Sequence, residues 1–317
     1  MAKWRVLITA PYMLPIIDEY ADVFKCNDAE YVKANVEERL EEDALLEIVG
    51  DYHAIIAGDD RFTRRVFEAA KNLKVLSKWG TGIDSYDQAA AADHGITITR
   101  TVDAFTEPVS DTVLGHILNF ARNLAAMDRH MKDGVWEKIP GRALNESTIG
   151  VIGVGATGSA VLRKARPFDA RLLGTDIAEL QPGHIKTLGV EMVSFETLLT
   201  DSDFVCLQCD LNETSHHLMN RDAFKRMKST AFFINCARGP VVDEQALIWA
   251  LENGEIAGAG LDVFEHEPLP ADSPLKQMHN VFMAPHNSNS SPKAWRNVHQ
   301  LTLDAMFGML NPDGPTA

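Results

Sequence analysis

The chain has 317 residues, of which 45% are hydrophobic and 24% are charged, and its formal net charge is −15. This composition is typical of a soluble globular protein, with a length sufficient for two domains. The negative charge disfavours non-specific binding to nucleic acid, and no apolar run reaches the length of a membrane-spanning helix. The N-terminus begins in a strand-like run rather than in a signal peptide. We therefore expect a cytoplasmic protein that binds neither nucleic acid nor a membrane.

Short apolar runs rich in β-branched residues alternate with helical patterns along the chain. The strand-like runs cover residues 4–9, 54–57, 74–78, 96–99, 149–153, 172–175, 204–208, 231–235, 259–263 and 281–284. The helical stretches between them include residues 38–49, 64–70, 159–168 and 244–252. This alternation predicts an α/β protein built from βαβ units, with parallel sheets covered by helices on both faces.

A single long helix is predicted over residues 107–131, where apolar residues recur at spacings of three and four. Thr106 is its expected N-cap, and Pro108 is tolerated in the first turn. A helix of this length spans roughly 37 Å, so we expect it to carry the chain from a first domain into a second. A last helix, beginning at Ser291 and Pro292, is expected to lead back to the first domain.

The four cysteines are interpreted as structural thiols. Cys206 and Cys209 form a C-x-x-C at the end of a strand-like run. Residues three apart on a strand point to opposite faces, so the pair is not expected to bind a metal or form a disulfide. Cys26 and Cys236 complete no zinc site with them.

The strongest local motif is Gly-Val-Gly-Ala-Thr-Gly, which follows a strand-like run directly and precedes a helical stretch. This context is typical of a dinucleotide-binding turn. Gly153 allows the tight turn, Gly155 lets a pyrophosphate approach the backbone, and Gly158 lets the helix pack on the strand. The N–H groups of Ala156 and Thr157 are expected to face the phosphates at the positive end of the helix.

An acidic residue, Asp176, ends the next strand-like run, close to where a ribose-binding carboxylate is expected. A carboxylate there accepts hydrogen bonds from the 2′-hydroxyl and repels a 2′-phosphate, which favours NAD over NADP. Arg171 or a nearby lysine approaching the ribose is the open alternative.

Three residues with chemically useful side chains, Arg238, Glu267 and His286, each follow a different strand-like run. Ligands of open α/β sheets bind outside the carboxyl ends of the strands, so the three are candidates for one cleft. A histidine is the natural proton donor to a forming alkoxide, a carboxylate on its other nitrogen orients it, and an arginine holds a carboxylate. Taken singly, each has an ordinary structural interpretation. Their shared position favours the catalytic one.

These motifs make the sequence resemble the D-isomer-specific 2-hydroxyacid dehydrogenases, a family that includes phosphoglycerate, glycerate and hydroxypyruvate/glyoxylate enzymes. The matching stretches are K-W-G-T-G-I-D at 78–84, G-V-G-A-T-G at 153–158, N-C-A-R-G-P-V-V-D-E-Q-A-L at 235–247, G-L-D-V-F-E-H-E-P at 260–268 and A-P-H-N-S at 284–288. The resemblance implies NAD as cofactor and hydride transfer at C2 of a D-2-hydroxy or 2-oxo acid. It also implies a Rossmann doubly wound domain at residues 104–286, inserted in a flavodoxin-like substrate domain of residues 1–103 and 287–317.

The resemblance also implies individual roles. Arg238 is the implied substrate-binding catalytic residue, Glu267 the partner of the histidine, and His286 the acid–base. Backbone N–H groups of the loop at 80–82 are expected to bind the substrate carboxylate, and Asp262 to lie near the nicotinamide carboxamide. The implied substrate-binding residues are Lys78, Trp79, Gly80, Thr81, Gly82 and Arg238. The implied cofactor-binding residues are Gly153, Gly155, Ala156, Thr157, Gly158, Asp176, Cys209, Thr214, Cys236, Ala237, Arg238, Asp262 and His286.

The sequence departs from the family pattern in three places. Residues 208–211 read Gln-Cys-Asp-Leu where the family usually has His-x-Pro-Leu beside the adenosine. Residues 109–111 read Val-Ser-Asp in place of Val-Ala-Glu, and Thr157 replaces a common isoleucine. None of these departures removes a catalytic role, but the first leaves the adenosine contacts open.

The glycine-rich loop at 80–82 resembles phosphoglycerate dehydrogenases more than glyoxylate reductases, and Lys78 before it is a candidate for binding a phosphate. The alternative is a solvated lysine, as is usual at strand ends. We therefore expect a phosphoglycerate-like acid, with a hydroxypyruvate/glyoxylate reductase or an NAD(H)-sensing corepressor-like protein as alternatives. Formate oxidation is disfavoured, because Pro285 stands where formate enzymes have Gln. Apolar residues on the long helix, together with the resemblance, lead us to expect a homodimer.

Overall fold

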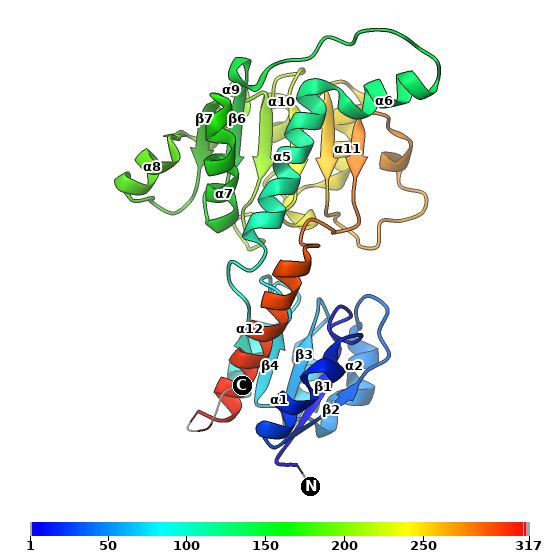
Figure 1. The fold of residues 1–317 in the computed structure, drawn as a ribbon, viewed down its shortest axis with the longest axis vertical. Coiled ribbons are helices and arrows are strands. Elements are labelled where there is room, and N and C mark those ends of the chain that lie inside the picture. Colours follow the sequence, from blue (N-terminus) through cyan, green and yellow to red (C-terminus); the bar gives the residue numbers. More distant parts are fainter. Residues whose placement is uncertain (1, 313, 315–317) are drawn as a thin grey trace. The chain divides into compact units, whose positions relative to one another are not determined.

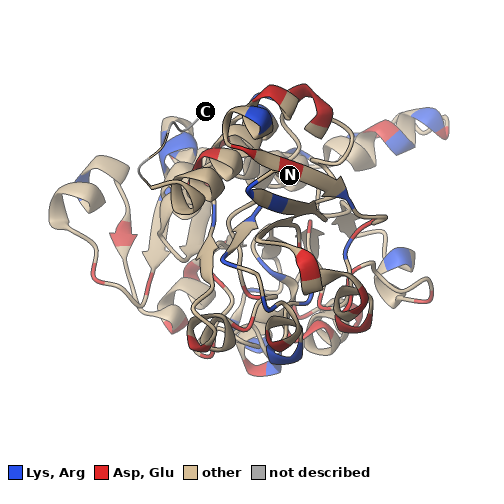
Figure 2. Ribbon diagram, turned by 90° about the horizontal axis from the view of Figure 1, so that it is seen from below, with Lys and Arg blue, Asp and Glu red and all other residues tan. Residues whose placement is uncertain are grey.

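The computed structural model describes residues 2–312 and 314 of the chain. Two compact units are present. The first unit consists of Met1–Phe105 and Ser291–Ala317, and the second unit of Thr106–Ser290. The sequence analysis predicts these divisions after residue 103 and before residue 287. Figure 1 shows the elements of each unit by label, and Figure 2 shows acidic residues spread over many helices and loops, in keeping with the net charge of −15.

The first unit is a parallel sheet in the order β2-β1-β3-β4-β5, with helices on both faces. This is the strand order of flavodoxin-like folds. Its strands are β1 (Trp4–Ile8), β2 (Ala29–Lys33), β3 (Ala54–Ala57), β4 (Val75–Lys78) and β5 (Thr97–Thr99), and its helices are α1 (Ala21–Cys26), α2 (Glu42–Ile48), α3 (Arg64–Ala69), α4 (Gln88–Asp93) and α12 (Pro292–Leu310).

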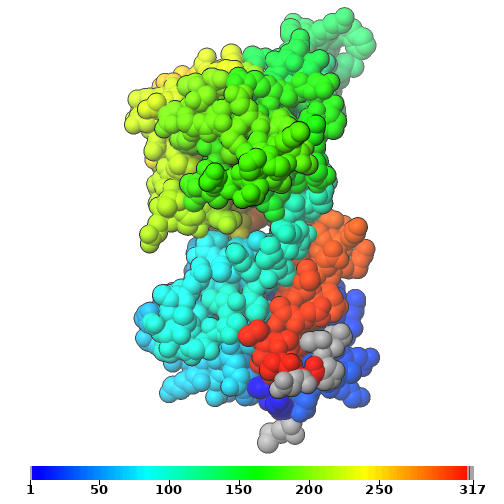
Figure 3. All heavy atoms as spheres, turned by 90° about the vertical axis from the view of Figure 1, so that its left-hand side faces the viewer, coloured from blue at the N-terminus to red at the C-terminus, as the bar shows by residue number. Residues whose placement is uncertain are grey.

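Alternation along β1 shows why this sheet is apolar on both faces. Val6 and Ile8 pack in one core with α1 and α12, whereas Leu7 packs in the other with α2, α3 and α4. Successive side chains of a strand point to opposite faces, so a buried central strand must be apolar throughout. Helix α12 is capped by the Ser291 side chain and packs on β4, and its Phe307 packs against Phe24 of α1, so this late helix lies beside the first elements of the chain (Figure 3).

The second unit is a parallel sheet in the order β12-β11-β10-β9-β6-β7-β8, which contains the doubly wound Rossmann order. Both predicted fold types are therefore confirmed. Its strands are β6 (Thr148–Ile152), β7 (Arg171–Thr175), β8 (Glu191–Met192), β9 (Phe204–Leu207), β10 (Phe232–Asn235), β11 (Gly258–Leu261) and β12 (Val281–Met283), and its helices are α5 (Thr106–Arg122), α6 (Leu124–Lys132), α7 (Ala156–Ala165), α8 (Pro182–Leu188), α9 (Phe195–Asp201), α10 (Arg221–Arg226) and α11 (Glu244–Glu252).

The helices of this unit cover both faces of its sheet (Figure 1). Along β9, Phe204 and Cys206 face the core shared with α5 and α7, and Val205 and Leu207 face the core shared with α9, α10 and α11. With both faces covered, polar groups that must reach a ligand are left at the ends of the strands. None of the helices in the described part of the chain is long and apolar enough to cross a membrane.

The prediction of one long helix over residues 107–131 is wrong. The helix breaks at Asn123, which adopts a left-handed conformation with φ of 52° and separates α5 from α6. Asparagine tolerates this conformation, and its side-chain amide donates a hydrogen bond to the Pro140 carbonyl at 2.9 Å. Thr106 is the first residue of α5 rather than a cap outside it.

Two strands, β2 and β8, were not predicted. Both lie at sheet edges, and neither contains a fully buried residue. They lack the apolar pattern of the central strands because an edge strand packs against less of the core. Cys209 also lies beyond the end of β9, so the strand argument does not apply to it. All four cysteines are free thiols.

Candidate active site

The turn between β6 and α7 requires glycine at two of its three glycine positions. Gly153 has φ of +87°, and a Cβ atom there would lie 2.6 Å from the backbone nitrogen of Cys209. A Cβ atom at Gly158 would overlap the carbonyl group of Gly153, because the first turn of α7 packs directly on the strand end. Side chains are therefore excluded at both positions.

Gly155 differs from the other two, because a Cβ atom there would meet nothing within 4 Å. The backbone is bare at the point where α7 begins, at Ala156. The first N–H groups of a helix have no intrahelical partner and lie at its positive end, which suits an anion. The turn thus fits the diphosphate of a dinucleotide, and this fit depends on the absence of a side chain at Gly155.

The side chain of Asp176 is hydrogen-bonded to this turn. One carboxylate oxygen accepts a hydrogen bond from the Val154 backbone N–H at 2.7 Å, and the other accepts one from Ala178 at 2.8 Å. The carboxylate is therefore held beside the glycine motif with lone pairs remaining for ribose hydroxyls. Arg171, the alternative considered for this position, pairs with Glu191 and Asp201, both at 3.1 Å.

Two residues after β9 that the resemblance implies as cofactor-binding, Cys209 and Thr214, differ in their surroundings. Cys209 is packed over Gly153, and burial raises the pKa of its thiol to about 11, so the thiol is neutral near pH 7. Thr214 is exposed, and its hydroxyl and its backbone N–H both donate to the side chain of Asn212, at 2.7 and 2.8 Å. Burial also raises the pKa of the Cys236 thiol, which lies just past β10.

Arg238, Glu267 and His286 follow β10, β11 and β12, which are neighbours at one edge of the sheet. His286 Nδ1 lies 3.0 Å from Glu267 Oε2, and Glu267 Oε1 accepts a hydrogen bond from the Phe264 N–H at 2.9 Å. The carboxylate therefore has one oxygen anchored to its own loop and the other on the imidazole. This arrangement orients the ring and favours a proton on Nδ1.

Asp262 has a structural part in this site that the sequence analysis did not anticipate. Its side chain is fully buried, and it accepts hydrogen bonds from the backbone N–H groups of Asn287 at 2.7 Å and Ser288 at 2.9 Å, and from the Ser288 hydroxyl. Its own carbonyl accepts from the His286 N–H at 2.7 Å. Asp262 thus holds the segment that carries His286, whose φ is +50°.

The turn that carries Arg238 is in backbone contact with the loop that carries Glu267. A Cβ atom at Gly239 would overlap the Phe264 carbonyl and lie 2.6 Å from the Glu265 nitrogen. The turn is closed by Asn235, whose side-chain amide donates to the Arg238 carbonyl at 3.1 Å and whose side-chain oxygen accepts from the Ala237 N–H at 3.0 Å. The backbone contact at Gly239 therefore fixes the turn that carries Arg238 relative to the loop that carries Glu267.

The predicted substrate loop lies in the first unit, after β4. Gly80 has φ of +128°, its carbonyl accepts from the Thr101 N–H at 2.9 Å, and the Thr81 hydroxyl donates to the Thr101 carbonyl at 2.8 Å. Trp79 is buried and donates to His299 Nδ1 at 2.9 Å. Hydrogen bonds to Thr101 and His299 thus hold the loop that includes Gly82 in place.

Lys78 is not solvated, which corrects one of the two interpretations of this residue. It is 3% exposed, and its ammonium group donates to the Gly58 carbonyl and to an Asp59 carboxylate oxygen, both at 2.6 Å. The Lys78 ammonium group, which the sequence analysis considers for binding a phosphate, is therefore already paired with the Asp59 carboxylate of the same unit.

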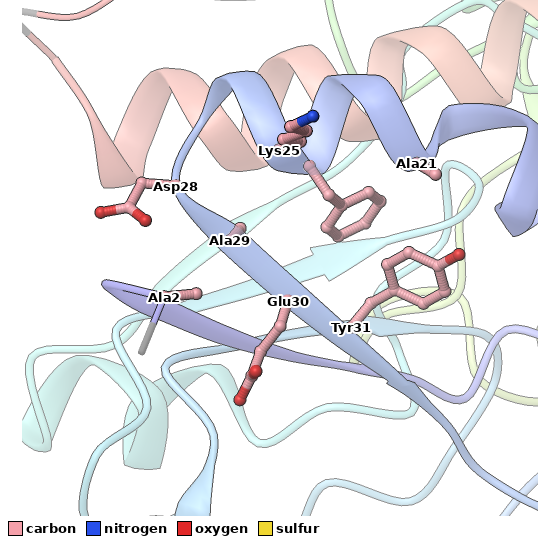
Figure 4. A pocket seen from close by; sticks show the side chains of 8 residues that line it. Ala2, Ala21, Lys25, Asp28, Ala29, Glu30 and Tyr31 are labelled. Atoms are coloured by element: carbon pink, nitrogen blue, oxygen red, sulfur yellow. The ribbon is translucent and has the colours of Figure 1, made fainter.

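A hollow in the first unit lies between α1 and the beginning of β2 (Figure 4). It is at the amino end of a parallel sheet, whereas the loop at Gly80 follows the carboxyl end of β4. It contains none of the predicted site residues. Its lining consists of Ala2, Ala21, Phe24, Lys25, Asp28, Ala29, Glu30 and Tyr31.

Comparison with known proteins gives consistent results. The family model described as D-isomer specific 2-hydroxyacid dehydrogenase, NAD binding domain, matches residues 114–288. Glyoxylate reductase of Korarchaeum cryptofilum is 38% identical over 278 residues, covering 86% of this chain and 83% of that protein. Glyoxylate/hydroxypyruvate reductase B of Klebsiella pneumoniae is 35% identical over 262 residues, covering 81% of each. Among solved structures, D-lactate dehydrogenase of Aquifex aeolicus, complexed with NAD and lactic acid, shares the fold with a TM-score of 0.88, at 24% identity over 98% of this chain and 96% of that one.

Proposed function

The chain belongs to the D-isomer specific 2-hydroxyacid dehydrogenase family and is an NAD-dependent oxidoreductase, and from that premise we propose that it reduces glyoxylate and hydroxypyruvate. The observation that carries the catalytic half of this proposal is the pair of His286 and Glu267, 3.0 Å apart at the carboxyl edge of the nucleotide-binding sheet. Bound NADH supplies the hydride for C2 of the acid. The remaining chemistry falls to the side chains of the chain itself.

His286 is the proposed proton donor. With Nδ1 hydrogen-bonded to Glu267, the proton that the ring exchanges with the substrate oxygen is the one on Nε2. The Glu267 carboxylate stabilises the protonated ring, which is the form required for reduction of a carbonyl. In the reverse direction the neutral ring accepts the proton from the hydroxyl group.

Arg238 is proposed to bind the substrate carboxylate and to polarise the reacting carbonyl, because its planar guanidinium forms paired hydrogen bonds with such groups. Backbone N–H groups of the loop at Gly80, Thr81 and Gly82 are proposed as the second anchor of the carboxylate. The glycine turn and Asp176 are proposed to hold the diphosphate and the adenine-side ribose of NAD.

The choice of acid rests on Lys78 and on the relatives. A phosphoglycerate-like acid is disfavoured because the Lys78 ammonium is buried against Gly58 and Asp59. Relatives that are 38%, 36% and 35% identical to this chain over the matched residues are named as glyoxylate or glyoxylate/hydroxypyruvate reductases, and others at 35% as putative 2-hydroxyacid dehydrogenases. These small acids need a carboxylate anchor and a proton donor but no phosphate site.

The test is NADH oxidation with a panel of 2-oxo acids: glyoxylate, hydroxypyruvate, phosphohydroxypyruvate and 2-oxoglutarate. We expect turnover with the first two, and a loss of kcat of several orders of magnitude in His286→Ala while the affinity for NADH is retained. A preference for phosphohydroxypyruvate would overturn the choice of acid. Tight NADH binding without turnover of any acid would instead favour the sensor alternative.

We also propose that the protein is a homodimer. Helix α6 contains no buried residue, and Leu124 and Met131 on it are 56% and 55% exposed, with Trp136 beyond it 88% exposed. Apolar side chains gathered in one segment are typical of an interface. Sedimentation of the Leu124→Asp/Met131→Asp variant should show a monomer if this segment lies between subunits, and an unchanged assembly would refute that placement.

A further inference from the structure

Hydrogen bonds join His217 in the loop after β9, Glu265 in the loop after β11 and Glu244 at the start of α11, and the proposed mechanism uses none of these residues. Glu265 Oε1 lies 2.8 Å from His217 Nε2. Glu265 Oε2 accepts a hydrogen bond from the Glu244 N–H at 3.1 Å, and Glu244 Oε2 accepts one from the Glu265 N–H, also at 3.1 Å. Glu265 is therefore tied to α11 by a reciprocal pair of bonds and to the β9 loop by the histidine.

This network stands next to the catalytic pair in the chain. Glu265 is two residues before Glu267, and its backbone belongs to the same loop whose Phe264 N–H anchors the Glu267 carboxylate at 2.9 Å. His217 also donates its own N–H to the Pro240 carbonyl at 3.0 Å, in the turn that follows Arg238. One histidine thus touches both loops that carry proposed catalytic residues.

Two carboxyl groups, those of Glu244 and Glu265, lie close together at this point. Burial raises the pKa of Glu244, the hydrogen bond from the Glu265 N–H opposes this rise, and the charge of the Glu265 carboxylate adds to it. His217 Nε2 lies within hydrogen-bond distance of Glu265 Oε1, so it holds the carboxylate oxygen that the Glu244 N–H does not bind. The titratable groups around Glu265 are His217, Glu244, His266 and Glu267, and His216 stacks on His217 at 4.0 Å between ring centroids.

We propose that His217, acting through Glu265, is a positioning residue for the pair of Glu267 and His286. This inference rests on the proposed catalytic role of that pair. His217 holds Glu265, Glu265 fixes the loop against α11, and the fixed loop presents the Glu267 carboxylate to the imidazole at hydrogen-bond distance. Loss of the His217 hydrogen bond frees the loop without removing any group that touches the substrate.

The experiment compares His217→Ala with His217→Gln. Both replacements place a residue with a Cβ atom in the left-handed backbone conformation at this position, where φ is +50°. The difference in activity between the two variants therefore reports the side chain alone. His216→Ala is the matched control, because His216 is an exposed neighbour of the same type. We expect kcat for glyoxylate to fall about tenfold in His217→Ala and to be largely restored in His217→Gln, with the KM for NADH unchanged in both.

The pH profile separates positioning from general loss of structure. Reduction requires the protonated imidazole, so kcat/KM falls as the pH rises. A displaced Glu267 stabilises the protonated ring less, so the fall in kcat/KM should begin at a lower pH in His217→Ala than in the parent, and should be unchanged in His216→Ala. A kcat and a pH midpoint equal to those of the parent would overturn the inference. If His286→Ala also kept full activity, the proposed function would be the part that fails.

Discussion

Replacing Gly239 by alanine should separate the two loops that hold Arg238 and Glu267. The added Cβ atom would overlap the Phe264 carbonyl and lie 2.6 Å from the Glu265 nitrogen, where contacts under 3.0 Å essentially do not occur. No flexible side chain is in the way, so one backbone segment must move, by on the order of 1 Å. Misplacement of this size costs about 100-fold in rate, equivalent to about 2.7 kcal/mol of transition-state stabilisation.

We therefore expect kcat/KM for glyoxylate to fall about 100-fold in Gly239→Ala, measured by NADH oxidation. The affinity for NADH, followed by fluorescence, should fall less than kcat/KM, because the glycine turn after β6, which fits the diphosphate, is not part of this contact. The free energy of unfolding should fall by about 1–3 kcal/mol, as for other overpacked sites. Gly183→Ala is the control, because a Cβ atom there meets nothing within 4 Å. A kcat/KM within threefold of the parent would refute the argument that this backbone contact sets the catalytic geometry.

Gly155→Ala should fold with an unchanged melting temperature, since no atom beyond its two chain neighbours lies within 4 Å of the new Cβ, and it should weaken NADH binding at least tenfold. Unchanged binding would remove the turn from the diphosphate site. Lys78→Met should lower the free energy of unfolding by about 1–3 kcal/mol, because the hydrogen bonds to Gly58 and Asp59 are lost. The preference for hydroxypyruvate over phosphohydroxypyruvate should not change. A loss of kcat/KM for the phosphorylated acid alone would restore the phosphate hypothesis. With a pKa of about 11, Cys209 carries about one thiolate in a thousand at pH 8, and this fraction rises with pH. Iodoacetamide should therefore label exposed Cys26 well before Cys209 in the native protein, and equal rates at pH 8 would contradict the burial of that thiol.

The parallel sheets were predictable from the residues because their central strands are local features of the sequence, whereas their assignment as Rossmann and flavodoxin-like came from the family resemblance. A parallel strand covered on both faces must be apolar throughout, so runs such as β3 and β9 stand out from one sequence. The glycine turn was predictable for a related reason. A left-handed φ at Gly153 and a missing side chain at Gly158 are requirements of single positions, which the residue type itself reveals.

The break at Asn123 and the edge strands were not predictable in this way. The periodicity of apolar residues continues across Asn123, and only the Pro140 carbonyl, seventeen positions along the chain, shows what its side chain bonds to. Edge strands β2 and β8 pair with a neighbour on one side only, so their side chains carry a weak apolar signal.

The sequence by itself determined which residue types are available for chemistry and after which strands they stand. It placed Arg238, Glu267 and His286 at strand ends, and their catalytic roles remain proposals for the experiments above. Only the tertiary structure decided which groups meet: Lys78 with Asp59, and His217 with Glu265. The physical reason is that each of these bonds joins residues at or beyond the ends of two different strands, whose separation in space is set by sheet order and packing, not by any spacing along the chain.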